Sequence, residues 1–160
     1  MTVRGARADD LLHFAAVFAD AVRTAGPSRY TPEQVDAWVR AADNPEAFGR
    51  QMLAARTFVA EDERGIAGFA TLEPDGRVAM LHVRGDRQRR GLGSRLLAVA
   101  VRAAVEGGAE RAYAEASAFS LPLFLREGFA VVEAETVVRA GVTFERHRVE
   151  RRLRPGRPGP

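Results

Sequence analysis

The sequence predicts an α+β fold: a mixed, mostly antiparallel sheet of about six to seven strands, with helices on both faces. Apolar residues recur at helical spacing before residue 57 and again from 91 to 106, and they alternate in the segments between and after. Short turn signals separate the alternating segments, which favours antiparallel neighbours. With 160 residues, 46% hydrophobic and 28% charged, the chain fits a single domain, expected over 1–153.

Three helices are predicted before the first strand of this meander. An Asp of the segment 8–10 can cap the first helix, whose apolar spacing continues to about Arg23 before Gly26-Pro27-Ser28 breaks it. The second helix has a strong start at 31–34, where Thr, Pro and Gln take the cap, first-turn and capping-box positions. Asn44-Pro45 interrupts the pattern, and a short third helix follows.

Strands dominate the rest of the chain. A meander of three strands is predicted at 57–61, 66–73 and 77–83. A helix begins near Gly91 and ends at Gly107-Gly108, with an apolar stripe wide enough for extensive burial. A strand, a helix and a hairpin follow, at 111–116, 121–126, and 130–139 with 142–153. The tail 154–160 is rich in Pro, Gly and Arg and is expected to be disordered.

Two missing residue types exclude several chemistries. The chain has no Cys, so disulfides, thiolate metal sites and a covalent cysteine intermediate are excluded. Every one of its 24 basic residues is Arg, and without Lys there is no Schiff-base nucleophile and no P-loop lysine. No apolar run is long enough to cross a bilayer and the N-terminus is too polar for a signal peptide, so we expect a cytoplasmic protein without a membrane partner.

The basic character of the chain raises the possibility of a nucleic-acid-binding protein, which would show strongly salt-dependent DNA affinity. The net charge is only +3, although the sequence pI is near 10.4. The arginines are dispersed among 21 acidic residues, and no aromatic platform accompanies them. We therefore expect no nucleic-acid partner.

The segment 88–94, Gln-Arg-Arg-Gly-Leu-Gly-Ser, has the chemistry of a diphosphate-binding loop. It lies between a predicted strand and a predicted helix, whose first amides have no internal partner and carry the positive end of the helix dipole. Gly91 and Gly93 allow a phosphate to approach these amides closely, and Ser94 adds a hydroxyl donor. Arg89 and Arg90 can add charge-assisted hydrogen bonds.

Two other nucleotide-binding motifs do not fit this segment. The Walker motif requires Lys after its last glycine, and the chain has none. The dinucleotide fingerprint requires a third glycine where Leu96 stands, and a tighter connection from strand to helix. Alternatively, the segment binds no ligand: the glycines only allow a sharp turn, and the arginines only form a solvated face.

The segment and its surroundings resemble the GNAT (Gcn5-related N-acetyltransferase) superfamily. Leu81-His82-Val83, a short loop and Gln88-x-x-Gly91-x-Gly93 are similar to the signature of that family. Equivalents of other family segments occur at 3–10, 65–68 and 123–129, so that the resemblance covers about 2–153. It implies a GNAT-like fold and direct transfer of an acetyl group from acetyl-CoA to a primary amine.

The resemblance also implies where the cofactor binds. The pantetheine arm would lie between the strands 77–83 and 111–116, which splay apart in this family, and would pair with main-chain groups near Leu81 and Val83. The diphosphate would lie on the amides of 88–94. The residues implied to contact the cofactor are Leu81, His82, Val83, Gln88, Arg89, Arg90, Gly91, Leu92, Gly93, Ser94 and Phe124.

The residues that move protons are not evident from the resemblance. Many family members have Tyr where this chain has Phe124, and their frequent base positions fall here at Arg77 and Ala79. None of these three side chains is a suitable acid or base, which leaves open a non-catalytic acyl-CoA-binding sensor or partner module as an alternative. Glu115 and Glu73 are the candidate catalytic residues, although each can also be an outward-facing strand residue.

The three histidines are interpreted without a catalytic or metal role. His82 can titrate near neutral pH, but its place between Leu81 and Val83 favours packing under a helix. His13 and His147 have no ligand spacing, so no metal site is expected.

The acceptor site cannot be identified from these residues. In this family it is built from the segments that correspond to 26–30 and 139–143. Tyr30 and Trp38 can line it, although core packing is favoured for both. A small-molecule amine and a protein amino group both remain open as acceptors, and a homodimer through the terminal hairpin is possible.

Overall fold

The computed structural model describes residues 1–153, which form seven strands and five α-helices. The strands are β1 (Thr2–Gly5), β2 (Arg56–Asp62), β3 (Gly65–Leu72), β4 (Val78–Val83), β5 (Arg111–Ala116), β6 (Ala130–Arg139) and β7 (Val142–Arg152). The helices are α1 (His13–Ala25), α2 (Pro32–Val39), α3 (Pro45–Ala54), α4 (Leu92–Glu106) and α5 (Leu121–Arg126). The disorder expected for 154–160 concerns residues outside this described part.

The strands form two antiparallel sheets, ordered β1-β2-β3-β4 and β5-β7-β6. The sheets meet at one parallel bridge, between Arg77 and Tyr113, at the start of β4 and within β5. Beyond this bridge, β4 pairs only with β3 among the described strands, so its other edge is open. The predicted α+β class with a mostly antiparallel sheet and helices on both faces is confirmed.

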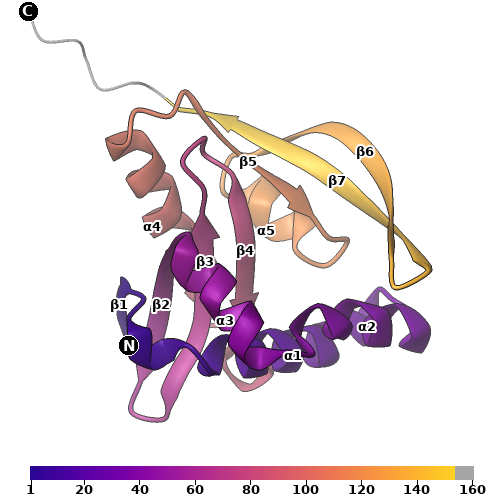
Figure 1. Cartoon of the computed structure of the whole chain (residues 1–160). Helices are drawn as coiled ribbons and strands as arrows, with labels where there is room; N and C mark the ends of the chain where they lie inside the picture. The colour runs from indigo at the N-terminus through magenta and orange to yellow at the C-terminus, as the bar shows by residue number, and fades with distance from the viewer. Residues whose placement is uncertain (154–160) are drawn as a thin grey trace, which may run out of the picture.

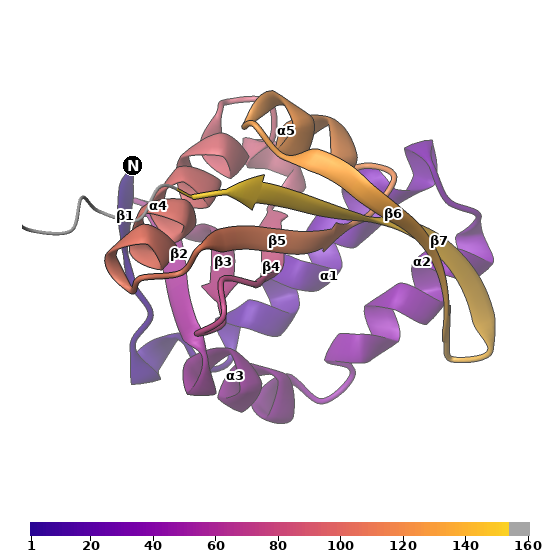
Figure 2. The ribbon, with the colours of Figure 1, turned by 90° about the horizontal axis from the view of Figure 1, so that it is seen from above.

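Helices cover both faces of the first sheet, as Figures 1 and 2 show. On one face, α1 and α3 pack on β2–β4, and the core includes Phe14, Phe18 and Phe69. Phe14 meets Phe69 edge to face at 5.2 Å between ring centroids. On the other face, α4 lies close to β3 because small strand residues such as Ala67 and Ala70 leave room for it.

The chemistry at the helix starts agrees with the predictions except at the first helix. Thr31 and Gln34 form the predicted capping box of α2: the Gln34 amide donates to Thr31 Oγ1 at 3.2 Å and the Thr31 amide to Gln34 Oε1 at 3.0 Å. Asp10, in contrast, ends the short 3-10 turn η1 (Ala8–Asp10) and does not cap α1. Its carboxylate accepts from the Arg7 amide at 2.7 Å and from the Arg4 guanidinium at 2.9 Å, so it is directed back toward β1.

β1 is a strand that the sequence analysis did not predict separately. Its four residues are too few for an alternating pattern to stand out, and pairing with β2 creates the strand. No helix within 1–153 is both long and apolar enough to span a membrane.

Candidate functional site

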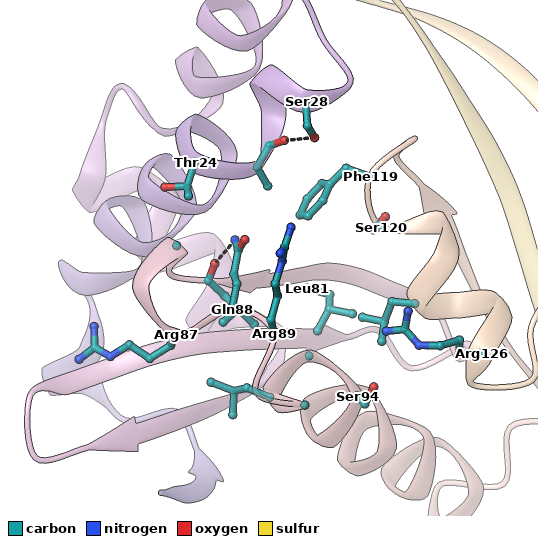
Figure 3. Close-up of a pocket in the computed structure, with 17 residues that line it drawn as sticks. Thr24, Ser28, Leu81, Arg87, Gln88, Arg89, Ser94, Phe119, Ser120 and Arg126 are labelled. Atoms are coloured by element: carbon teal, nitrogen blue, oxygen red, sulfur yellow. Dashed lines mark hydrogen bonds between the residues drawn. The ribbon is translucent and has the colours of Figure 1, made fainter.

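A cavity of about 550 Å³ opens where β4 ends and α4 begins. We call it the loop cavity. Most of the predicted cofactor residues line it: Leu81, Val83, Gln88, Arg89, Gly91, Leu92, Gly93 and Ser94. The C-terminal turn of α1 and the beginning and end of α5 complete its wall, and Figure 3 shows these elements around it.

Unpaired backbone amides line the helix end of the loop cavity. The amides of 89–94 donate to no backbone carbonyl among the described residues, whereas the Arg95 amide donates to the Gly91 carbonyl at 3.0 Å. Gly91 precedes α4 with φ +75, in the left-handed region that glycine adopts without strain. These amides, with the helix dipole behind them, have the chemistry to bind an anion.

The arginines around the loop have three different environments. Figure 3 shows the Arg89 side chain extending across the cavity toward Phe119, from a backbone with φ +62. Arg90 is exposed and does not line the cavity. Arg87 is buried and points away, with its guanidinium 3.2 Å from Asp62 and 2.9 Å from Asp86. It therefore fixes the loop to the β2–β3 turn.

Other side chains also hold this loop in place. Gln88 Nε2 donates to the Val83 carbonyl at 2.9 Å, so this side chain closes the turn after β4. The hydrogen bond from Arg87 lowers the pKa of both Asp62 and Asp86, which keeps these partners ionised. Arg126 also lines the cavity, and the sequence analysis did not single it out.

A second cavity, of about 270 Å³, lies between the diverging strands β4 and β5, and we call it the strand cavity. Its wall includes Trp38 of α2, Met80 and His82 of β4, Glu115 of β5 and Arg139 of β6. The two cavities are adjacent, because Leu81, Phe119 and Ser120 line both. A long molecule in the loop cavity can thus reach the strand cavity along the open edge of β4.

Both predicted catalytic carboxylates pair with one arginine. Arg77 Nε lies 3.0 Å from Glu115 Oε2, and Arg77 Nη1 lies 2.9 Å from Glu73 Oε1. Burial acts to lower the Arg77 pKa, but the hydrogen bond with Glu115 and the two nearby carboxylates raise it overall. Glu115 lines the strand cavity and Glu73 lines neither cavity, so only Glu115 can meet a molecule held there.

His82 packs under α1, as the sequence indicated. Its ring centroid is 4.8 Å from that of Phe18 and 5.8 Å from that of Phe69. Burial, together with the positive charge of Arg139, lowers its pKa to about 4, so the ring is neutral at pH 7. Its Nδ1 is buried and has no hydrogen-bond partner among the described residues.

The aromatic residues at this end of the molecule pack as a cluster. Tyr30 meets Trp38 edge to face at 5.4 Å and Phe144 at 5.9 Å, which agrees with the packing role favoured from sequence, and Trp38 also lines the strand cavity. The Tyr30 hydroxyl accepts from the Ala118 amide at 2.8 Å, so it fixes the loop after β5. Phe124 packs against Phe129 at 5.1 Å and borders the strand cavity, not the loop cavity.

Two serines that the sequence analysis did not single out shape the loop after β5. Ser117 Oγ and Ser120 Oγ are 3.0 Å apart, and each accepts from the other's backbone amide at 3.0 Å. This local exchange holds the Ser120 side chain at the boundary between the two cavities. Within 1–153, no group of three His, Cys, Asp or Glu side chains is placed to hold a metal ion.

The comparisons with known proteins agree on one family. Residues 27–151 match the family model of the acetyltransferase (GNAT) domain. A GCN5-related N-acetyltransferase from Rhodopseudomonas palustris superposes with a TM-score of 0.90 at 26% identity, over 95% of each chain. No curated protein matches the chain.

Two further solved structures share the fold at lower identity. The PaiA N-acetyltransferase from Thermoplasma acidophilum, in complex with coenzyme A, has a TM-score of 0.75 at 13% identity over 96% of this chain and 100% of its own. YncA from Salmonella typhimurium, with its cofactor acetyl-CoA, has a TM-score of 0.68 at 22% identity over 100% of this chain and 97% of its own. The matched domain spans most of the sequence, and the chain belongs to the GNAT acetyltransferase family.

Proposed function

We propose that this chain is an N-acetyltransferase that moves the acetyl group of acetyl-CoA directly to a primary amine. The main observation is the continuity of the two cavities: a surface of free amides at the start of α4 leads along the open edge of β4 into a second cavity. Such a path suits a cofactor with a diphosphate at one end and a thioester at the other.

The chemistry of each part of the path supports this cofactor. The amides of 91–94 would bind the diphosphate, with Arg89 adding a positive charge. The edge of β4 near Leu81 and Val83 is not paired with another strand. Its groups, apart from the Val83 carbonyl that accepts from Gln88, would pair with the amide groups of the pantetheine arm, as an added strand does. Two proteins with the same fold, PaiA and YncA, hold coenzyme A and acetyl-CoA.

In the reaction, the neutral amine attacks the thioester carbonyl and a C–N bond forms. As the C–S bond breaks, the nitrogen loses a further proton to water and the departing CoA sulfur takes up a proton from water. We assign the proton of the incoming ammonium to Glu115, directly or through water, because its carboxylate lines the strand cavity. Glu73 would help to hold Arg77, and through it Glu115. Ser120 would donate a hydrogen bond toward the leaving sulfur from the boundary of the cavities.

One observation favours a second function, a module that binds acyl-CoA without catalysis. Phe124 stands where many relatives have Tyr, and its buried ring packs on Phe129 and offers no proton to a thiolate. Under this alternative the loop cavity would still bind acetyl-CoA, but no amine would be acetylated.

Calorimetric titration with acetyl-CoA, combined with thiol release and mass spectrometry over a panel of amines, tests the proposal. We expect saturable binding below about 1 mM, the upper end of ordinary KM values, and acetylated product from at least one amine. Absence of binding at that concentration contradicts the proposed function. Binding without an acetylated product from any amine contradicts the catalytic proposal and supports the binding module.

A further inference from the structure

We propose that the acceptor amine carries a carboxylate, as a free amino acid does, and that Arg139 binds this carboxylate in the strand cavity. This inference rests on the proposed function, since it names the substrate class of the same site. The observation behind it is that Arg139 has no carboxylate partner. Arg139 lines the strand cavity, and its guanidinium makes neither an ion pair nor a hydrogen bond with any residue within 1–153.

The environment of Arg139 makes this lack of a partner costly. Burial and the nearby Arg146 lower its pKa overall, although Tyr30 and Glu115 act to raise it and its guanidinium carbon makes a cation–π contact 5.7 Å from the ring centroid of Phe144. The nearby Arg146 cannot compensate, because it is a cation and already lies 2.9 Å from Glu135. A partly desolvated arginine without a counterion is stabilised most by a ligand anion, and its planar fork matches a carboxylate.

The ionisable groups lining the strand cavity agree with a carboxylate ligand. Four such residues line it: Arg77, His82, Glu115 and Arg139. Arg77 and Glu115 pair at 3.0 Å, and burial keeps His82 neutral at pH 7. Of the two arginines in the wall, Arg139 has no ion pair, although the charge of Glu115 acts to raise its pKa. An amine with a neutral remainder would leave this half-buried charge without an ion pair, whereas an amino acid would neutralise it.

The size and walls of the strand cavity favour a small acceptor. Its volume of about 270 Å³ lies near the lower end of small-molecule sites. Phe18, Trp38, Met80, Phe119 and Phe124 form apolar walls that would surround the side chain of such a molecule. Glu115 on β5 would receive the amine while Arg139 at the end of β6 holds the carboxylate.

The test compares matched amines that differ only at the carboxylate. The common free amino acids would be assayed beside their C-terminal amides, with acetyl-CoA binding measured on the same protein. For a free acid that is acetylated, we expect kcat/KM about 10- to 100-fold above that of its amide, since a charge-assisted hydrogen bond is lost in the amide. Arg139→Gln should raise KM for the acid by about the same factor and leave the amide unchanged, which removes the preference.

Two further variants separate recognition from folding. Arg139→Lys keeps the charge without the planar fork and should retain part of the preference for the acid. Arg152→Gln removes an exposed arginine from the far end of the same hairpin. It should leave kcat/KM unchanged for both the free acid and the amide. The thermal midpoint of each variant would be measured to compare folding.

Several results would overturn the inference while leaving the proposed function intact. These are equal or faster acetylation of the amides, an equal effect of Arg139→Gln on acid and amide, or acetyl-CoA binding without acetylation of any free amino acid. Failure to bind acetyl-CoA would instead contradict the proposed function, so the two failures are distinguishable.

Discussion

The two cavities of this molecule are built in different ways. The loop cavity relies largely on the backbone amides of Arg89 and of residues 91–94, and the local sequence specifies the glycines and the helix start that present them. The strand cavity relies on side chains from α1, α2, β4, β5 and β6 and from the loop after β5, which only the complete fold brings together. A cofactor with constant chemistry suits the first construction, and an acceptor particular to this chain suits the second.

This difference predicts how the two sites respond to substitution. Changes in the loop cavity should weaken cofactor binding and leave the choice of amine intact. Changes in the strand cavity should affect the rate or the choice of amine and leave cofactor affinity intact. Substitutions in each cavity, and a change of pH, can break this separation.

Replacing the proposed base should have the largest effect. We expect Glu115→Gln to lower kcat by about 100- to 10,000-fold, the usual contribution of a positioned base, with an unchanged acetyl-CoA dissociation constant. The matched control is Glu73→Gln, which removes the other carboxylate partner of Arg77 but no residue of either cavity. Equal losses in the two variants would show that holding Arg77 matters and that Glu115 is not the base.

Acid should lower the free energy of unfolding of the protein through His82, which lines the strand cavity. Its folded pKa of about 4 lies below the ordinary 6.5, so the unfolded chain takes up the proton first and stability falls as pH drops from about 6.5 to 4. The difference corresponds to a loss of about 3 kcal/mol in the free energy of unfolding across this window. Urea titrations should show this slope in the native chain and in exposed His13→Gln, and should lack it in His82→Gln. An unchanged slope in His82→Gln would contradict the assignment.

A charge placed in the loop cavity should weaken the cofactor. A Cβ at Gly93 would lie 3.1 Å from Leu123 Cδ2 and 4.0 Å from Val83 Cγ2, two side chains that line this cavity. We expect Gly93→Asp to raise the acetyl-CoA dissociation constant by about 30-fold, through crowding and repulsion of the diphosphate. Asn has nearly the same size as Asp but no charge. Comparing the acetyl-CoA dissociation constants of Gly93→Asp and Gly93→Asn by calorimetry would therefore isolate the effect of the charge. Equal affinities for the two variants would argue against a phosphate at these amides.

The smallest effect distinguishes two neighbouring arginines. Arg89 lines the loop cavity and Arg90 does not. We expect Arg89→Ala to weaken acetyl-CoA binding about 5-fold at low salt, a difference that should shrink as salt screens the charge. Arg90→Ala should change it less than about 2-fold, because an exposed charge outside the site contributes little. The reverse order would show that the loop binds its ligand in another arrangement.

Elements that depend on neighbouring residues were predictable from the sequence, whereas elements that depend on distant contacts were not. The capping box at Thr31, the hairpin of β6 and β7 and the loop before α4 depend on neighbouring residues, and each was predicted at the right place. β1 was missed because four residues become a strand only by pairing with β2, which is far along the chain. The expectation that an Asp of 8–10 caps the first helix was wrong, because α1 begins after Leu12 and the Asp10 carboxylate is held by Arg4, outside that helix.

The candidate site illustrates the same limit. Gly91 and Gly93 predicted a glycine turn before a helix from the local sequence alone; that turn is present and lines the loop cavity, and its binding of an anion stays a prediction. Nothing near Glu115 in the sequence indicates that Arg77 holds it, since their ion pair depends on the bridge between the two sheets. Likewise, the sequence cannot show that Arg139 has no ion pair, because this depends on the positions of all the elements packed around it.

A crystal structure of the complex with acetyl-CoA would locate the cofactor on this path. We expect the diphosphate within hydrogen-bond distance of the amides of 91–94, and the pantetheine arm along the open edge of β4. The acetyl group should lie beside Ser120, where the two cavities meet. A cofactor bound away from these amides, or an acetyl group directed away from the strand cavity, would contradict the proposed function.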